Sequence, residues 1–245
     1  MNLSRNTTIA ATIVVAVSIL SYSYLHRFQY SESNNITVKG LGAVDFKSDL
    51  IVWEGSFNAE SNTLNDAYAE LSADRAVVKE FLKNKGIAEK EIIFGAVSTS
   101  ERTKNIYNSE GNIIGEDFIG YRLSQSVRIG SGDLEKVELV SRSITEVLNN
   151  GVKFYSESPS YFYTKLQDLK LDLVSKATED AKTRANIIAK MGGASIGDLK
   201  TAQMGVFQIV GQNSNEEYSW GGSFNTSSKY KTASITMDLT YELKN

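Results

Sequence analysis

The sequence predicts an α+β fold in which antiparallel-rich sheets pack with three helices, preceded by one N-terminal hydrophobic helix. Apolar and polar residues alternate with period two most clearly at 118–129 and 229–243, two of seven expected strands, and apolar residues recur at helical spacing in three other segments. The predicted order is ββαββαβαββ. Several strands follow one another directly, which favours α+β over a doubly wound parallel sheet. An uncharged apolar run, Ile9–Leu20, precedes all of these segments.

Residues 1–30 are predicted to be a membrane anchor or a signal segment. The apolar run of 12 residues matches the core of a signal peptide, whereas its weaker extension over residues 9–25 reaches 17, the lower limit for a spanning helix. Cleavage after Ser23 is one alternative, but Tyr22 and Tyr24 crowd that position and resemble an interfacial aromatic belt. Both alternatives export the rest of the chain. We expect an uncleaved inner-membrane anchor and a polar linker over residues 31–35.

The first folded elements are two strands at 36–46 and 50–60, which we expect to form a hairpin. Ser61 or Asn62 is expected to cap a helix that Gly86 ends. The apolar stripe expected to face inward comprises Leu64, Ala67, Tyr68, Leu71, Val78, Phe81 and Leu82.

Strands at 92–99 and 118–129 follow, linked by a polar tip at Asn108–Asn112. A second helix is expected to open at Ser131 or Asp133 and to close at Asn149–Gly151. Its inward side chains are Leu134, Val137, Val140, Ile144, Val147 and Leu148.

A strand at 152–163 contains the single proline, Pro159, so we expect it at a sheet edge or at a bulge. A third helix spans 165–191 and ends at Gly192-Gly193, and strands at 196–209 and 229–243 close the chain. The inward stripe expected for this helix is Leu166, Leu169, Leu173, Ala177, Ala181, Ile188 and Met191. We treat residues 36–245 as one domain because composition changes nowhere within them.

Composition argues against most catalytic chemistry. The chain has no cysteine, and its one histidine, His26, follows the apolar segment. Thiolate catalysis, histidine triads and His- or Cys-based metal sites are therefore not expected in the folded part. Beyond residue 28 the chain has 24 basic and 29 acidic residues, so we expect no nucleic-acid binding. We predict no catalytic residue, no cofactor and no metal site.

Carboxylates leave one enzymatic alternative open. Glu116-Asp117 and Glu216-Glu217 are adjacent acids. A carboxylate-dependent hydrolase acting on envelope glycans would need two acids converging in a pocket, with the pKa of one raised.

A polar, glycine-rich segment at 211–228 contains three aromatic residues, Tyr218, Trp220 and Phe224. Long loops in compact domains are uncommon and are usually functional or disordered. We consider two interpretations: a contact surface for another copy or a partner, or a flexible insertion whose aromatic residues pack locally.

The order and spacing of several motifs resemble the SIMPL domain family, which includes periplasmic immunogenic proteins of the bacterial outer envelope. The similarity covers nearly all of 36–243, although Lys47-Ser48-Asp49 stands where the family usually has proline before aspartate. The matching motifs are Ile36–Gly42, Lys85-Gly86-Ile87, Gly120-Tyr121-Arg122, Asp133–Val137, Asp180–Ala185 and the final strand. The resemblance implies an α+β fold, export to the envelope and, in some members, ring-like or channel-like oligomers.

We therefore expect a periplasmic or cell-envelope protein that acts without catalysis, as a self-associating scaffold. Its expected partners are other copies of itself and the membrane, through its N-terminal segment. A stress-related role is suggested by the family resemblance alone, and the sequence names no other protein partner.

Overall fold

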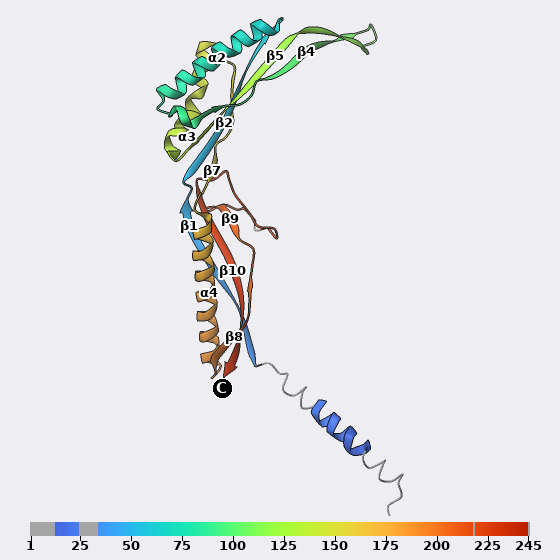
Figure 1. Cartoon of the computed structure of the whole chain (residues 1–245), viewed down its shortest axis with the longest axis vertical. Helices are drawn as coiled ribbons and strands as arrows, with labels where there is room; N and C mark the ends of the chain where they lie inside the picture. The colour runs from blue at the N-terminus through green and yellow to red at the C-terminus, as the bar shows by residue number, and fades with distance from the viewer. Residues whose placement is uncertain (1–12, 25–33, 218, 245) are drawn as a thin grey trace, which may run out of the picture. The chain divides into compact units, whose positions relative to one another are not determined.

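The computed structural model describes residues 13–24, 34–217 and 219–244. In this part the chain is mixed α/β, with antiparallel sheets and four α-helices, the first over residues 13–24. The remaining elements, in chain order, are β1 (Asn35–Lys47), β2 (Leu50–Ser61), α2 (Leu64–Asn84), the 3₁₀ turn η1 (Glu89–Glu91), β3 (Ile92–Phe94), β4 (Ser98–Tyr107), β5 (Ile113–Ser131), α3 (Leu134–Ser143), the 3₁₀ helix η2 (Ile144–Asn150), β6 (Phe154–Ser156), β7 (Ser160–Phe162), α4 (Leu166–Met191), β8 (Ser195–Met204), β9 (Gln208–Gly211) and β10 (Tyr230–Lys244) (Figure 1).

These elements form two compact units built from interleaved segments. Unit 1 comprises residues 1–42, 173–205 and 235–245, and unit 2 comprises 43–172 and 206–234. Because each unit draws on distant parts of the chain, no single point in the sequence marks a boundary between them.

Unit 2 is built on a sheet with the strand order β3-β5-β2-β6, in which β4 also pairs with β5 and β7 with β2. Its strands pair antiparallel, and β2 and β5 stay in register from Ile51↔Ser131 to Ser61↔Tyr121. α2, α3 and η2 supply the helical half of the core. The largest fully buried side chains of this core are Trp53, Phe57, Ile51, Leu71, Leu82, Leu123, Ile129 and Ile144.

A close contact between β2 and β6 fixes the aromatic centre of unit 2. The ring of Phe154 stacks on Trp53 at 5.8 Å between centroids and on Phe57 at 6.3 Å. Between those two residues, Gly55 leaves room for the ring, since a Cβ there would lie 2.5 Å from it. The indole Nε1 of Trp53 donates to Ser156 Oγ at 3.1 Å, so this buried donor is satisfied.

Unit 1 is a sheet in the order β1-β10-β8 with α4 packed on it. Gly40 and Gly42 allow β1 to approach the helix backbone closely. A Cβ on Gly40 would lie 2.1 Å from the carbonyl oxygen of Ala177, and a Cβ on Gly42 would lie 2.3 Å from that of Leu173. The glycines therefore serve helix–strand packing.

A side chain of α4 also satisfies the backbone of β1. The Leu41 N–H donates to Asp180 Oδ2 at 2.8 Å, and Arg184 Nε lies 2.9 Å from the same oxygen. The Leu41 hydrogen bond and then Arg184 lower the pKa of the Asp180 carboxyl below its ordinary value. Asp180 thus joins the helix to the strand with a charge-assisted bond.

The predicted hairpin of the first two strands is wrong. β1 pairs in the sheet of unit 1, whereas β2 is central in the sheet of unit 2. The link between them bonds elsewhere, since Ser48 N donates to Lys229 O at 2.9 Å and Asp49 N to Phe162 O at 3.0 Å. These bonds replace the cross-strand pairs that a hairpin turn would make.

Three predicted strands are divided differently. The strand expected at 92–99 is β3 followed by the start of β4, and the strand expected at 196–209 is β8 followed by the start of β9. The strand expected at 152–163 is two short strands, β6 and β7, on either side of Pro159. Both pair with β2, and β6 ends the strand order as predicted for an edge strand, while Pro159 lies between β6 and β7 in neither strand.

Helix ends were predicted better than helix faces. Gly86 and Gly151 end their helices with φ of +84° and +86°, and Asp133 caps α3, as predicted. The cap of α2 is Thr63, whose side chain accepts from Asp66 N, so the predicted Ser61 or Asn62 is wrong. None of the described helices is both long enough and apolar enough to cross a membrane.

Five apolar side chains predicted to face inward are instead exposed. The buried face of α4 runs through every fourth residue from Leu169 to Ala189, with alanine at 177, 181, 185 and 189, and Ala177 and Ala181 lie against Gly40 of β1. Ile188 and Met191 lie off this face. In α2 the first turn projects Leu64 and Tyr68 outward, and Leu148 lies outside the buried side of η2.

Candidate interaction surface

The segment between β9 and β10 is held by one buried amide. Gln208, at the start of β9, donates from Nε2 to Ser219 O at 2.7 Å. Its Oε1 accepts from Ser223 N at 2.8 Å and from Ser219 N at 3.3 Å. A single side chain therefore fixes both ends of the five-residue stretch 219–223.

That stretch is a tight turn that displays Trp220. Gly222 N donates to Ser219 O at 3.0 Å, which closes a β-turn with Trp220 and Gly221 at its centre. Gly222 has φ of +94°, and a Cβ there would lie 2.9 Å from the carbonyl oxygen of Phe207, so this position requires glycine. Trp220 is 100% exposed. The turn thus presents a whole indole ring to solvent.

Glu216 and Asn225 fasten the two sides of the segment to each other. Glu216 accepts from Gly211 N at 3.1 Å and from the side-chain amide of Asn225, and Asn225 Oδ1 accepts from Ser228 N at 2.8 Å. The carbonyl of Ile209 accepts from Asn225 N at 3.0 Å. The segment is therefore ordered by its own polar side chains, which argues against a flexible insertion.

Lys231, at the start of β10, holds the aromatic segment through its side chain. Its side chain is buried, and Nζ donates to Tyr161 O at 2.6 Å and to Asn225 O at 2.5 Å. Burial lowers the pKa of the Lys231 ammonium to about 8, against the opposing influence of Glu216. The ring of Phe224 lies 6.0 Å from Nζ and is half exposed. Lys231 thereby links β10, β7 and the aromatic segment.

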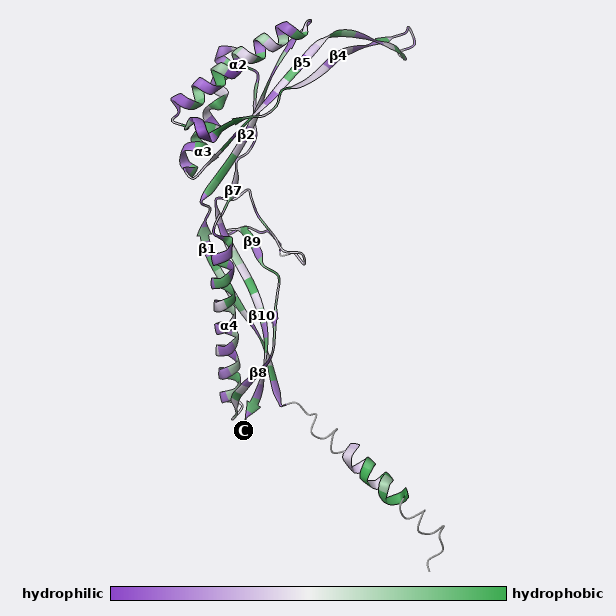
Figure 2. Ribbon diagram, in the orientation of Figure 1, coloured by the Kyte–Doolittle hydropathy of each residue, from purple (hydrophilic) through white to green (hydrophobic). Residues whose placement is uncertain are grey.

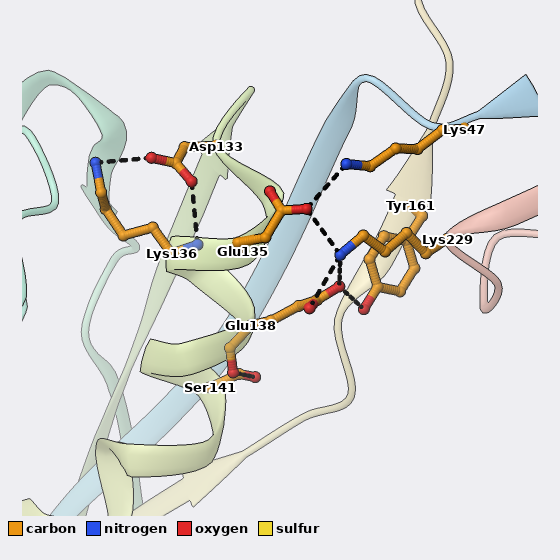
Figure 3. A network of polar contacts seen from close by, with 8 residues as sticks. All are labelled: Lys47, Asp133, Glu135, Lys136, Glu138, Ser141, Tyr161 and Lys229. Atoms are coloured by element: carbon orange, nitrogen blue, oxygen red, sulfur yellow. Dashed lines mark hydrogen bonds and ion pairs between the residues drawn. The ribbon is translucent and has the colours of Figure 1, made fainter.

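An ion-pair network joins Glu135 and Glu138 of α3 to residues outside that helix (Figure 3). Lys229 lies 3.1 Å from both Glu135 and Glu138, Lys47 donates to Glu135 at 2.9 Å, and the Tyr161 hydroxyl donates to Glu138 at 3.0 Å. Bonds from Lys47 and Lys229 lower the pKa of Glu135 to about 2. Burial alone would lower the pKa of Lys229, but its bonds to the two glutamates outweigh burial and raise it.

This network makes a prediction for acid stability. The pKa of Glu135 is depressed in the folded state, so its contribution is present above pH 4.5 and is lost as pH falls through about 2. We expect Glu135→Gln to flatten the fall in the free energy of unfolding across this window, measured by urea denaturation at several pH values. Glu157→Gln, whose side chain is exposed, should keep the wild-type slope; an equal change in both variants would contradict the assignment.

The structure separates the three predicted aromatic residues. Trp220 lies on the turn, and the backbone of Phe224 forms an isolated β-bridge with Ile209 of β9. Tyr218 lies outside the described residues. Sequence reasoning missed Gln208 and Lys231. The sequence did contain a signal for Lys231, because alternate residues of the last strand point to the same side. That side carries the buried residues Ala233, Ile235, Met237, Leu239 and Tyr241.

The two carboxylate pairs of the hydrolase hypothesis lie on different elements, one on β5 and one in the segment between β9 and β10. Glu116 and Asp117 face Asn105 and Lys104 across the β4–β5 ladder, and Glu216 is used within its own loop. Among the described residues, no three His, Cys, Asp or Glu side chains gather so as to hold a metal ion.

One carboxylate of α2, Asp74, has a raised pKa. Burial, and then the neighbouring charge of Glu70, raise the pKa of Asp74 above its ordinary value. Glu70 lies one helical turn away on the same helix. The raised pKa is therefore explained by burial and a like charge within one helix.

Comparison with protein families gives one match. The family described as SIMPL, protein of unknown function (DUF541), matches residues 36–241, which cover β1 to β10. A comparison with curated proteins finds no match.

Proposed function

The chain belongs to the SIMPL family, and on that basis we propose that it is a non-enzymatic protein of the cell envelope that acts by binding and self-assembly. The observation that carries this proposal is Trp220, a fully exposed indole on a turn held by Gln208. Tryptophan is among the residues that contribute most to binding energy at protein interfaces, and a pre-ordered loop loses little entropy on binding.

Strand edges offer a second route to association. Among the described strands, β8 pairs only with β10 and β4 pairs only with β5, so each has an edge to which another chain can add. Both edges belong to strands of ten residues. We propose that the scaffold is built from such surfaces, with the Trp220 turn as one contact.

We further propose that the chain is exported and anchored to the inner membrane by residues 9–25. The uncharged run Ile9–Leu20 supports this proposal, as does the solvent exposure of the apolar side chains in the helix over 13–24. Fractionation of cells, with sequencing of the mature N-terminus, tests it; a soluble protein lacking the first 23 residues would show a cleaved signal instead.

The test of self-assembly is the mass of the full chain in mild detergent, measured by light scattering. We expect a mass several times 27.0 kDa. Trp220→Ala should weaken association about 30-fold, as expected for loss of an interface residue worth about 2 kcal/mol. Thermal stability should not change, because the ring is fully exposed.

Tyr155→Ala provides the matched control, since Tyr155 is also an exposed aromatic residue of unit 2. It should leave the mass unchanged. A wild-type chain that stays monomeric at high concentration would contradict the proposed function, and a Trp220→Ala chain with the wild-type mass would remove the turn from the contact.

A further inference from the structure

The end of the β4–β5 pair is a two-stranded ribbon without a third strand. β2 stops pairing with β5 at Tyr121, and among the described residues the stretch 113–120 pairs only with β4. We call residues 102–107 of β4 together with 113–120 of β5 the ribbon. Two-stranded ribbons are marginally stable in water without a cover. Binding of a partner would therefore stabilise the ribbon.

The ribbon carries exposed apolar side chains among polar residues (Figure 2). Its exposed apolar side chains are Ile106, Tyr107, Ile113, Ile114, Phe118 and Ile119. Ile114 is 65% exposed near the tip. Large apolar side chains left in water on one short segment make it a candidate interaction site.

The charge of the ribbon tip is purely acidic. Residues 105–116 contain Glu110 and Glu116 and no Lys or Arg. The surrounding unit 2 has the same sign, with 23 acidic and 17 basic residues. A partner for this tip should therefore combine apolar side chains with positive charge.

The same chain carries such a surface at the end of α4. Residues 182–191, which we call the α4 end, contain three basic residues and no acid. Arg184 is already paired with Asp180, which leaves Lys182 and Lys190 for a partner. The α4 end also exposes Ile187, Ile188 and Met191, the last of them 86% exposed. It lies in unit 1, whose described residues have seven basic and five acidic side chains.

We propose that the ribbon of one copy docks on the α4 end of a second copy. The apolar side chains of the two surfaces would supply the buried area, and Glu110 and Glu116 would face Lys182 and Lys190 to set the orientation. This inference rests on the self-assembly proposed above and names its surfaces. Because the two surfaces differ, the contact is head-to-tail, and repetition gives a ring or a filament.

Charge reversal in the full chain, in the same detergent, tests the pairing. Glu110→Lys with Glu116→Lys should weaken association at least tenfold, and Lys182→Glu with Lys190→Glu should do the same, because each variant then opposes like charges. An equal mixture of the two should recover the wild-type mass, since each ribbon then meets an α4 end of opposite sign. Glu80→Lys with Glu157→Lys makes the same change of net charge elsewhere on unit 2 and should have no effect.

The outcomes separate this inference from the proposed function. A wild-type oligomer whose mass survives both reversals, or a mixture that stays dissociated, overturns the docking and leaves self-assembly standing. A wild-type monomer overturns both.

A cross-linking experiment shows directly which surface contacts the ribbon, and it does not depend on charge. The chain has no cysteine, so Ile114→Cys and Ile188→Cys each introduce a single thiol. Under mild copper-catalysed air oxidation, we expect a disulfide-linked dimer when the two variants are mixed. A linked dimer from Ile114→Cys alone would show ribbon-to-ribbon contact and overturn the proposal, as would the absence of any product from the mixture.

Discussion

Gly40→Ala is expected to destabilise unit 1 by about 3 kcal/mol, the upper part of the usual range for an overpacked core. The new Cβ would lie 2.1 Å from the carbonyl oxygen of Ala177 and 2.6 Å from Ala181 N. Both atoms belong to the helix backbone, so no side-chain rotation relieves the contact. α4 must move away from β1, which also costs the bond from Leu41 to Asp180.

Urea denaturation followed by circular dichroism measures this loss. Gly130→Ala is the matched control, because a Cβ on Gly130 meets no atom within 4 Å, and its stability should change by less than about 0.5 kcal/mol. Adding Ala181→Gly to Gly40→Ala should recover little stability, since the Ala177 carbonyl would still be in contact. Full recovery would show that the contact is one between side chains.

The second large effect concerns Lys231 and alkaline pH. Its pKa falls from 10.5 in the unfolded chain to about 8 in the folded one. Below pH 8 both states carry the proton and folding bears the full cost of burying the charge. Between pH 8 and 10.5 the unfolded chain binds more protons, so the free energy of unfolding rises with pH, by about 3 kcal/mol in all.

Lys231→Met isolates this contribution. The difference in unfolding free energy between the wild type and the variant should shift in favour of the wild type by this amount as pH rises from 7 to 10.5. A variant with the wild-type pH dependence would assign the rise to other groups. At every pH the variant also leaves the carbonyls of Tyr161 and Asn225 without their donor, so the aromatic segment should exchange its amide hydrogens faster.

The sequence predicted local structure well where one residue decides it. The helix stops at Gly86 and Gly151 follow from the left-handed backbone that glycine adopts, and the position of Pro159 follows from its missing N–H. The last strand was predicted from its alternation, and its inward residues are buried as expected.

Predictions failed where tertiary packing decides. Pairing of β1 with β10 joins segments about two hundred residues apart, and no local pattern distinguishes it from a hairpin with β2. The face of α4 was misread because apolar size suggested Ile188 and Met191, whereas the buried side continues through Ala185 and Ala189. Periodicity predicts that a helix has a buried side, but the element packed against the helix determines which residues form that side.

The aromatic segment was singled out by composition and not by geometry. Three aromatic residues in a polar segment pointed to Trp220 and Phe224, but nothing local indicated that Gln208 would hold the turn. The ribbon was missed for a different reason. The strands expected at 92–99 and 118–129 leave 102–107 and 113–117 out, and the point at which β2 stops pairing with β5 is a property of the whole sheet.

The place of β10 in the sheet has a consequence for synthesis. This strand lies between β1 and β8, so neither neighbour has its partner until residues 235–244 have left the ribosome. Most of unit 2, in contrast, comes from the uninterrupted stretch 43–172. Contacts of such long separation form slowly, because a large loop must close first. During synthesis, β1 therefore remains unpaired longer than the other described strands, because its partner β10 is made last.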